Sequence, residues 1–226
     1  SRSTSPDCPG CVIGLDENLR ILVDAGYGVI SIDELGHGET QGLIRLMDPD
    51  HEGKSLIAVL DWAEGKLDWI ARGTGAGGQK NNLIVGAVGG SYGGAYQLLL
   101  NAIDPRQRLD ALVPEITFYS LVYALAPNDV LRAGWDLGVY AAGQSGGSGV
   151  DRAHYDPFVN SFMLEAVTSN QMTDAGRDFF AYHGHSYFCE GVPVATNGPG
   201  RVPGFAPNPP PRVHAMFFQG MRDPIF

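Results

Sequence analysis

A serine in the middle of a Gly-x-Ser-x-Gly sequence is the clearest candidate for chemistry in this chain. Ser91 lies between Gly89 and Gly93, in the pattern of a nucleophile elbow. In such a turn the serine takes strained backbone angles, and the glycines leave room for a strand and a helix to pass closely. The hydroxyl of Ser91 would then be exposed. The backbone N–H of Tyr92, in the first turn of the helix, would donate to the oxyanion that forms on the substrate.

The residues on either side of Ser91 predict the strand and the helix that this turn requires. Residues 83–88 form an apolar run rich in β-branched residues, which is typical of a strand buried on both faces. Residues 94–100 are typical of a helix packed back onto that strand. A glycine-rich turn without chemistry is the alternative, because the chain contains 31 glycines. The strand before the serine and the helix after it favour the catalytic interpretation.

A serine nucleophile needs an imidazole that takes its proton and a carboxylate that orients this imidazole. The chain has six histidines: His37, His51, His154, His183, His185 and His214. A role in shaping the turn is the simpler interpretation of His37, because it lies in a polar loop broken by glycines.

Metal binding has little support in the sequence. His183 and His185 resemble a chelating pair, but Cys189 is the only further candidate ligand near them. Cys8 and Cys11 form a single C-x-x-C, for which a local disulfide or two free thiols is a simpler interpretation than zinc. Cys189 itself is predicted to be a small packed side chain. We therefore predict neither a metal nor a cofactor.

Composition limits the class of protein and its partners. The chain has 226 residues, 44% of them hydrophobic, and a mean hydropathy of −0.06, which is typical of a soluble globular domain. A net charge of −10 argues against nucleic acid and anionic lipid, since both bind basic surfaces. No apolar run approaches the ~20 residues of a membrane span, and residues 1–5 are not a signal peptide. A cytoplasmic and a secreted protein both remain open, as does the oligomeric state.

Helix and strand patterns alternate along the chain. We expect helices at 12–25 and 50–70, strands at 28–32, 83–88, 109–116 and 213–219, and a helix after Ser91 that ends near residue 104. This order predicts an α/β fold with a mostly parallel sheet and helices on both faces. Trp62 and Trp69 are expected to complete the apolar face of the second helix.

The segment between the last two strands is too long for an ordinary connection. It contains two predicted helices, at about 120–142 and 156–182, and we expect it to be a helical cap over the active edge of the sheet. The chain would thus divide into a first core part at 1–119, the cap at 120–211 and a last core part at 212–226. Aromatic side chains of the cap are candidates for an acyl pocket, with the cap's own core as the simpler alternative: Phe158, Phe162, Phe179, Phe180, Tyr182, Tyr187 and Phe188.

Three stretches resemble a known family. They are residues 26–39, with Gly-Tyr-Gly-Val-Ile-Ser-Ile-Asp followed by Gly-His-Gly-Glu; residues 89–94, Gly-Gly-Ser-Tyr-Gly-Gly; and residues 219–226, Gln-Gly-Met-Arg-Asp-Pro-Ile-Phe. Together with the alternating order they resemble α/β hydrolases of the Xaa-Pro dipeptidyl-peptidase family, which also contains acyl esterases of the cocaine-esterase type. The resemblance implies that Ser91 is the nucleophile and Asp223 the acid of a catalytic triad.

The triad order in this fold is serine, acid, histidine, and no histidine follows Asp223. The resemblance also places a strand and the second oxyanion donor before the helix at 12–25. We therefore expect this chain to be a fragment of a longer protein, lacking the strands at each end of the domain and the catalytic histidine. Glu115 and Asp110, near the preceding strand, are the alternative acids.

We expect a serine hydrolase that cleaves an ester or a peptide bond through an acyl-enzyme. A plain carboxylesterase is the rival within the enzymes, because Leu35 replaces the arginine usual in the family, and the tryptophan usual after the strand at 109–116 is absent. A binding module on a hydrolase fold is the rival outside them.

Overall fold

The computed structural model describes residues 17–37, 40–145, 154–191 and 203–223. Its elements are α1 (Glu17–Asp24), η1 (Pro49–Gly53), α2 (Lys54–Lys66), β1 (Arg72–Gly73), β2 (Asn82–Leu83), β3 (Val85–Gly90), α3 (Tyr92–Ile103), β4 (Leu109–Glu115), α4 (Leu121–Leu125), η2 (Pro127–Asp129), α5 (Ala133–Ser145), α6 (Pro157–Ser169), α7 (Asp174–Tyr182), α8 (His185–Glu190) and β5 (His214–Ala215). Cys8 and Cys11 lie outside the described residues. None of the helices that the structure describes is both long and apolar enough to cross a membrane.

The chain forms two compact units, one of residues 1–44 and 137–155, the other of residues 45–136 and 156–226. The larger unit contains β1 to β5, α2 to α4 and α6 to α8. The helices α6 to α8 thus share a compact unit with the sheet. The predicted boundaries of the cap, at 119/120 and 211/212, describe where it is inserted in the sequence, and they stay a prediction.

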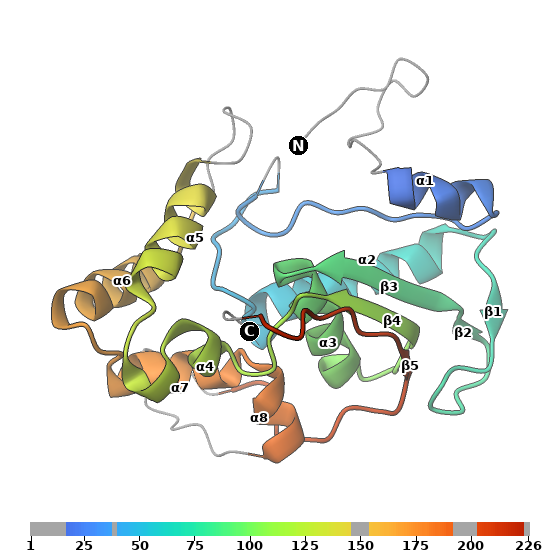
Figure 1. Cartoon of the computed structure of the whole chain (residues 1–226). Helices are drawn as coiled ribbons and strands as arrows, with labels where there is room; N and C mark the ends of the chain where they lie inside the picture. The colour runs from blue at the N-terminus through green and yellow to red at the C-terminus, as the bar shows by residue number, and fades with distance from the viewer. Residues whose placement is uncertain (1–16, 38–39, 146–153, 192–202, 224–226) are drawn as a thin grey trace. The chain divides into compact units, whose positions relative to one another are not determined.

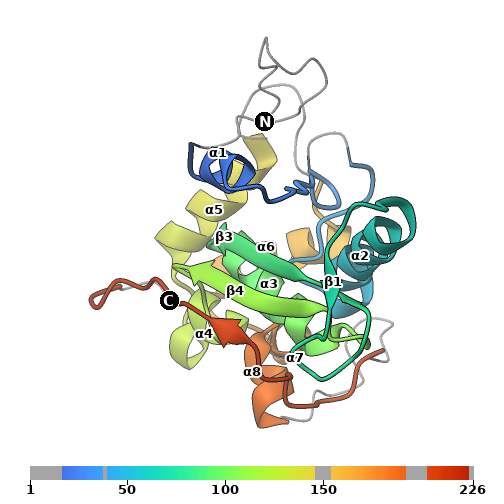
Figure 2. The same ribbon diagram turned by 90° about the vertical axis from the view of Figure 1, so that its right-hand side faces the viewer.

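A three-stranded parallel sheet is the centre of the larger unit. Its order is β3-β4-β5, so that β4 lies in the middle, and β1 and β2 form a separate antiparallel pair. Figures 1 and 2 show the three strands side by side, with α3 packed along β3 and β4. The α/β arrangement and the parallel pairing that the sequence predicted are confirmed for these strands.

The strand before Ser91 differs from the prediction in two ways. Leu83 belongs to β2 and pairs with β1, while the strand that leads to Ser91 begins at Val85. Residues of β3 alternate between half-buried and exposed, and Val88 is 50% exposed. The expectation of burial on both faces was wrong for the described residues of β3.

Other predicted elements are shorter than their sequence patterns. The predicted strand at 213–219 is confirmed only at His214–Ala215, with an isolated bridge from Phe218 to Glu115. The predicted helix at 156–182 is two helices, α6 and α7, because Asn170 takes a left-handed conformation with φ 53° and ends α6. Helix α2 ends at Lys66, so Leu67 lies beyond it.

Two predictions about exposure were also wrong. Trp62 is 52% and Trp69 is 63% exposed, since the buried face of α2 consists of Leu56, Leu60 and Ala63. Cys189 is exposed rather than packed, because α8 turns Tyr187 and Phe188 inward.

The smaller unit contains α1, an extended segment and most of α5. Helix α1 ends at Asp24, and Gly26 lies just beyond it, as predicted; Gly26 takes φ 89°, and its N–H donates to the carbonyl of Val23. The predicted strand at 28–32 is not formed among the described residues. A strand exists only where a neighbouring backbone pairs with it, whatever its β propensity. The pairing that is present joins Ile44 to Tyr155.

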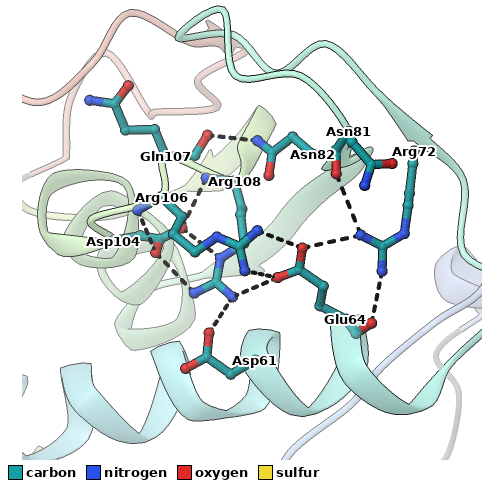
Figure 3. A network of polar contacts seen from close by, with 9 residues as sticks. All are labelled: Asp61, Glu64, Arg72, Asn81, Asn82, Asp104, Arg106, Gln107 and Arg108. Atoms are coloured by element: carbon teal, nitrogen blue, oxygen red, sulfur yellow. Dashed lines mark hydrogen bonds and ion pairs between the residues drawn. The ribbon is translucent and has the colours of Figure 1, made fainter.

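A buried arginine joins α2 to the end of α3 (Figure 3). The Arg108 side chain is fully buried, and its guanidinium donates to both carboxylate oxygens of Asp104 at 3.0 and 2.9 Å. A third hydrogen bond, of 2.6 Å, reaches Asp61 on α2. The side chains of Arg108 and Asp104 are both fully buried, whereas Asp61 is 58% exposed. A buried ion pair such as Arg108 with Asp104 is costly to break from one side only.

We expect Arg108→Met to lower the free energy of unfolding by about 3–5 kcal/mol, because Asp104 would remain buried without its partner. Chemical unfolding of the full-length protein measures this change. The matched control is Arg106→Met: Arg106 is 51% exposed and pairs with Glu64 at the surface, so its removal should cost less than about 1 kcal/mol. Equal losses in the two variants would contradict the prediction.

Candidate active site

Ser91 occupies a strained turn between β3 and α3. Its backbone angles are φ 53° and ψ −117°, which only glycine adopts without a penalty of about 1–3 kcal/mol. Hydrogen bonds hold this geometry on both sides. The Ser91 N–H donates to the Glu115 carbonyl at 2.8 Å, and the Ser91 carbonyl accepts from Ala95 N–H at 3.0 Å. The turn therefore places a half-buried serine at the carboxyl end of β3 and the N-terminus of α3.

Two glycines make the close passage of strand and helix possible. A Cβ on Gly89 would lie 3.0 Å from the Gly93 carbonyl carbon, and a Cβ on Gly94 would lie 2.9 Å from Thr117 Cβ. A Cβ on Gly93 would meet nothing within 4 Å. The prediction that Gly93 itself must lack a side chain was wrong, because its backbone, not its Cβ direction, faces Gly89. Sequence reasoning missed Gly94.

The ring of Tyr92 fastens the start of α3 to the segment before α2. Its hydroxyl accepts from Met47 N–H at 3.1 Å, and its ring packs edge-on against Tyr96 with 4.7 Å between centroids. Met47 has φ 69°, so this segment is strained as well. These contacts fix the first residue of α3, whose backbone N–H is the predicted oxyanion donor.

Buried carboxylates hold the segment that receives Tyr92. Glu52, fully buried, accepts from the N–H groups of Arg45 and Asp48. Burial raises the pKa of Glu52 to about 7. Asp48, also fully buried, lies 3.9 Å from the Nε2 atom of His183.

Gln97 on α3 joins the elbow to both neighbouring strands. Its amide nitrogen lies 3.3 Å from the Gly89 carbonyl oxygen and 3.2 Å from that of Val113, while its amide oxygen accepts from Val113 N–H at 2.8 Å. The side chain is 3% exposed. Because a buried amide with these partners fixes the distance between α3, β3 and β4, Gln97 sets the position of Ser91.

We expect Gln97→Leu to lower the free energy of unfolding by about 1–3 kcal/mol, since Val113 N–H would stay buried without an acceptor. Urea unfolding of the full-length protein measures the change. Gln171→Leu is the matched control, because Gln171 is an exposed loop residue and its replacement should change stability by less than about 0.5 kcal/mol. A Gln97 variant as stable as this control would show that the amide does not hold the elbow.

Asp223 lies in a turn after the strand segment that pairs with β4. Its N–H donates to the Gly220 carbonyl at 3.2 Å, and its Oδ2 accepts from the Gln219 side chain at 2.7 Å. Thr117 connects this turn to the elbow, because its N–H donates to Gln219 at 3.2 Å and its hydroxyl to the Ser91 carbonyl at 3.1 Å. The structure thus brings the segment that carries Asp223 to the end of β4 beside Ser91.

The two alternative acids lie at opposite ends of β4. Asp110 accepts from the N–H groups of Ala76 and Val85, at the start of β3. Six residues of β3 span about 20 Å, so Asp110 is remote from the turn of Ser91. Glu115 is opposite Gly90 at the end of β4 and is exposed. Of the two alternatives, only Glu115 remains near the elbow.

Comparison with known protein families identifies the family of this chain. The family described as X-Pro dipeptidyl-peptidase (S15 family) matches residues 3–184. The chain belongs to this family. Among curated proteins, none matches the chain. The match to the X-Pro dipeptidyl-peptidase family confirms the resemblance that the motifs suggested, and it includes the elbow with Ser91. Asp223 lies beyond the matched residues, so the match does not test the prediction that it is the triad acid.

The histidines of this X-Pro dipeptidyl-peptidase family member occupy several environments. His183 and His185 make separate contacts: His183 Nδ1 contacts the Leu46 carbonyl at 2.8 Å, and His185 Nε2 contacts Cys189 at 3.3 Å. Burial lowers the pKa of His185 and of His37. His214, in β5, is opposite Ala111 near the start of β4. Among the described residues no group of three or more histidine, cysteine or acidic side chains is arranged to hold a metal ion.

The aromatic residues of the predicted cap pack mainly on one another. Phe162 contacts Phe158 and Phe179 with centroid separations of 4.1 and 5.6 Å, and Tyr182 contacts Tyr187 at 5.0 Å. Six of the seven are buried: Phe162, Phe179, Phe180, Tyr182, Tyr187 and Phe188. The simpler of the two interpretations, an aromatic core for these helices, is therefore confirmed for these six.

Proposed function

We propose that this chain carries the nucleophile of a serine hydrolase with the α/β-hydrolase fold, which cleaves an ester or a peptide bond through an acyl-enzyme. The observation that carries the proposal is the strained backbone of Ser91, at φ 53°, between a parallel strand and a helix. Membership of the X-Pro dipeptidyl-peptidase family supports it. The family's name makes a peptide bond that follows proline the first substrate to test.

In the proposed reaction the Ser91 hydroxyl gives its proton to an imidazole while its oxygen bonds to the substrate's carbonyl carbon. The carbonyl oxygen becomes an oxyanion, which the Tyr92 N–H stabilises from the N-terminus of α3. Collapse of this intermediate breaks the bond to the alcohol or amine, which takes the proton from the imidazolium. Water then attacks the ester on Ser91 and releases the acid. Asp223 orients the imidazole and stabilises its charged form.

This chemistry needs no cofactor, since every proton and electron pair comes from serine, imidazole, substrate and water. We expect a small ester or peptide as the substrate, and neither nucleic acid nor a membrane as a partner. The net charge of −10 supports this expectation, because both of those partners bind through clustered lysine and arginine.

A fluorophosphonate probe tests the proposal, because it reacts with a serine only when that serine is activated as a nucleophile. We expect one adduct on the full-length protein, mapped by peptide mass to Ser91 and absent from Ser91→Ala. Parallel assays with a p-nitrophenyl ester and an Xaa-Pro anilide separate an esterase from a dipeptidyl-peptidase. An adduct that persists in Ser91→Ala would refute the assignment of the nucleophile.

A further inference from the structure

A chain of hydrogen bonds connects the backbone of Ser91 to the carboxylate of Asp223. The Thr117 hydroxyl donates to the Ser91 carbonyl at 3.1 Å, and the Thr117 N–H donates to the Gln219 Oε1 atom at 3.2 Å. The Gln219 Nε2 atom in turn donates to Asp223 Oδ2 at 2.7 Å. Gln219 thus uses both ends of one amide, its oxygen toward the serine side and its nitrogen toward the acid.

The backbone beside Gln219 is also fixed to the end of β4. Ile116 N–H donates to the Phe218 carbonyl at 2.7 Å, and Phe218 N–H donates to the Pro114 carbonyl at 3.1 Å. Ile116 adopts φ 37°, a conformation that is a genuine outlier for a β-branched residue. Strain of this kind persists where surrounding contacts determine the conformation, and it is concentrated at functional sites. The side-chain amide of Gln219 is therefore attached to a backbone whose position is fixed.

An acid that orients an imidazole must hold its carboxylate at a defined rotation. A hydrogen bond to one oxygen restricts rotation about the bond to the carboxylate carbon and so fixes the direction of the other oxygen. We infer that Gln219 is a positioning residue that sets the rotation of the Asp223 carboxylate relative to Ser91, with the Thr117 backbone as its anchor. This inference rests on the proposed function, in which Asp223 is the triad acid.

A purely structural role and a positioning role for Gln219 differ in what a substitution changes, stability or turnover. Because Gln219 is exposed, we expect its replacement to leave the unfolding midpoint within error of the unmodified protein. If the amide acts through Asp223, its loss should lower kcat, leave KM unchanged, and have no further effect once Asp223 is gone.

The test compares kcat for a p-nitrophenyl ester in full-length variants, with Ser91→Ala as background. We expect Gln219→Leu to lower kcat by about 10–100-fold, and to lower it no further when added to Asp223→Asn. Gln219→Glu keeps an acceptor for Thr117 N–H but presents a carboxylate instead of a donor, so it should be impaired at least as much. Gln171→Leu, at an exposed glutamine remote in sequence, should match the unmodified protein.

Each other outcome overturns the inference. Normal kcat in Gln219→Leu or Gln219→Glu, with Asp223→Asn impaired, would reject the positioning role and leave the proposed function intact. If Gln219→Leu lowered kcat by the same factor in the unmodified protein and in Asp223→Asn, Gln219 would not act through the Asp223 carboxylate. Full turnover in Ser91→Ala would remove the proposed function and this inference together.

Discussion

Ser91→Ala in the full-length protein is expected to lower turnover of an activated ester by on the order of 10⁶-fold, because no other group then bonds to the substrate carbonyl. The substitution removes one oxygen atom and keeps the Cβ. The hydrogen bonds that fix the turn, from Ser91 N–H to Glu115 and from Ala95 N–H to Ser91, involve backbone atoms only. We therefore expect the fold and the unfolding midpoint to be unchanged.

The matched control for this variant is Ser161→Ala. Ser161 is exposed on α6, and its hydroxyl donates to the Pro157 carbonyl at 3.1 Å within the same helix. It should retain full turnover and full labelling by the fluorophosphonate. If Ser91→Ala kept the activity of this control, the hydroxyl would have no part in the reaction, and a binding role for the fold would become the better interpretation.

The elbow was predictable because its geometry is encoded locally. Val85 to Gly90, Ser91 and the start of α3 are consecutive in sequence, and glycine spacing with an apolar strand before it has few other structural solutions. The space requirement at Gly94 was not predictable in the same way. It arises from Thr117, which is separated from Gly94 by a helix and a strand.

Hydrogen bonds to residues distant in sequence explain why the roles of Gln97 and Gln219 were not predicted. Gln97 resembles an ordinary polar residue of a helix, and nothing in the sequence indicates that its amide bonds to Val113 on β4. Gln219 was part of the motif that supported the family resemblance, but its bond to Thr117 depends on the pairing of residues 214–218 with β4. Hydrogen-bond partners of this kind are decided by tertiary packing and leave no local signal.

The errors in predicting strands and helix ends have a related cause. Residues 28–32 have the β-branched composition of a strand, yet strand formation depends on a paired neighbour as much as on composition. The helical pattern of apolar residues runs from Leu56 to Ile70. Helix α2 ends earlier, at Lys66, because the backbone of Leu67, with ψ 96°, is already extended. Periodicity reports which residues suit a helix and does not report where the helix ends.

Asp223→Asn is expected to lower turnover of the same ester by about 10⁴-fold with little change in stability. The amide would keep the size of the carboxylate but lose the charge that stabilises an imidazolium, and its NH₂ group could present a donor where the imidazole needs an acceptor. Asp223 is half-buried at the surface turn, so neither form is expected to disturb the core. The measurement is kcat at saturating ester, together with the unfolding midpoint.

Glu115→Gln is the control that separates the two acids near the elbow. Glu115 contributes its backbone carbonyl to Ser91 N–H, and the substitution leaves that carbonyl in place, so only the charge is lost. We expect nearly full turnover in Glu115→Gln and a 10⁴-fold loss in Asp223→Asn, on the order that removal of a triad carboxylate produces. The reverse pattern would move the triad acid to the end of β4. It would also leave Gln219 bonded to a carboxylate with no catalytic role, since the Gln219 amide donates to Asp223.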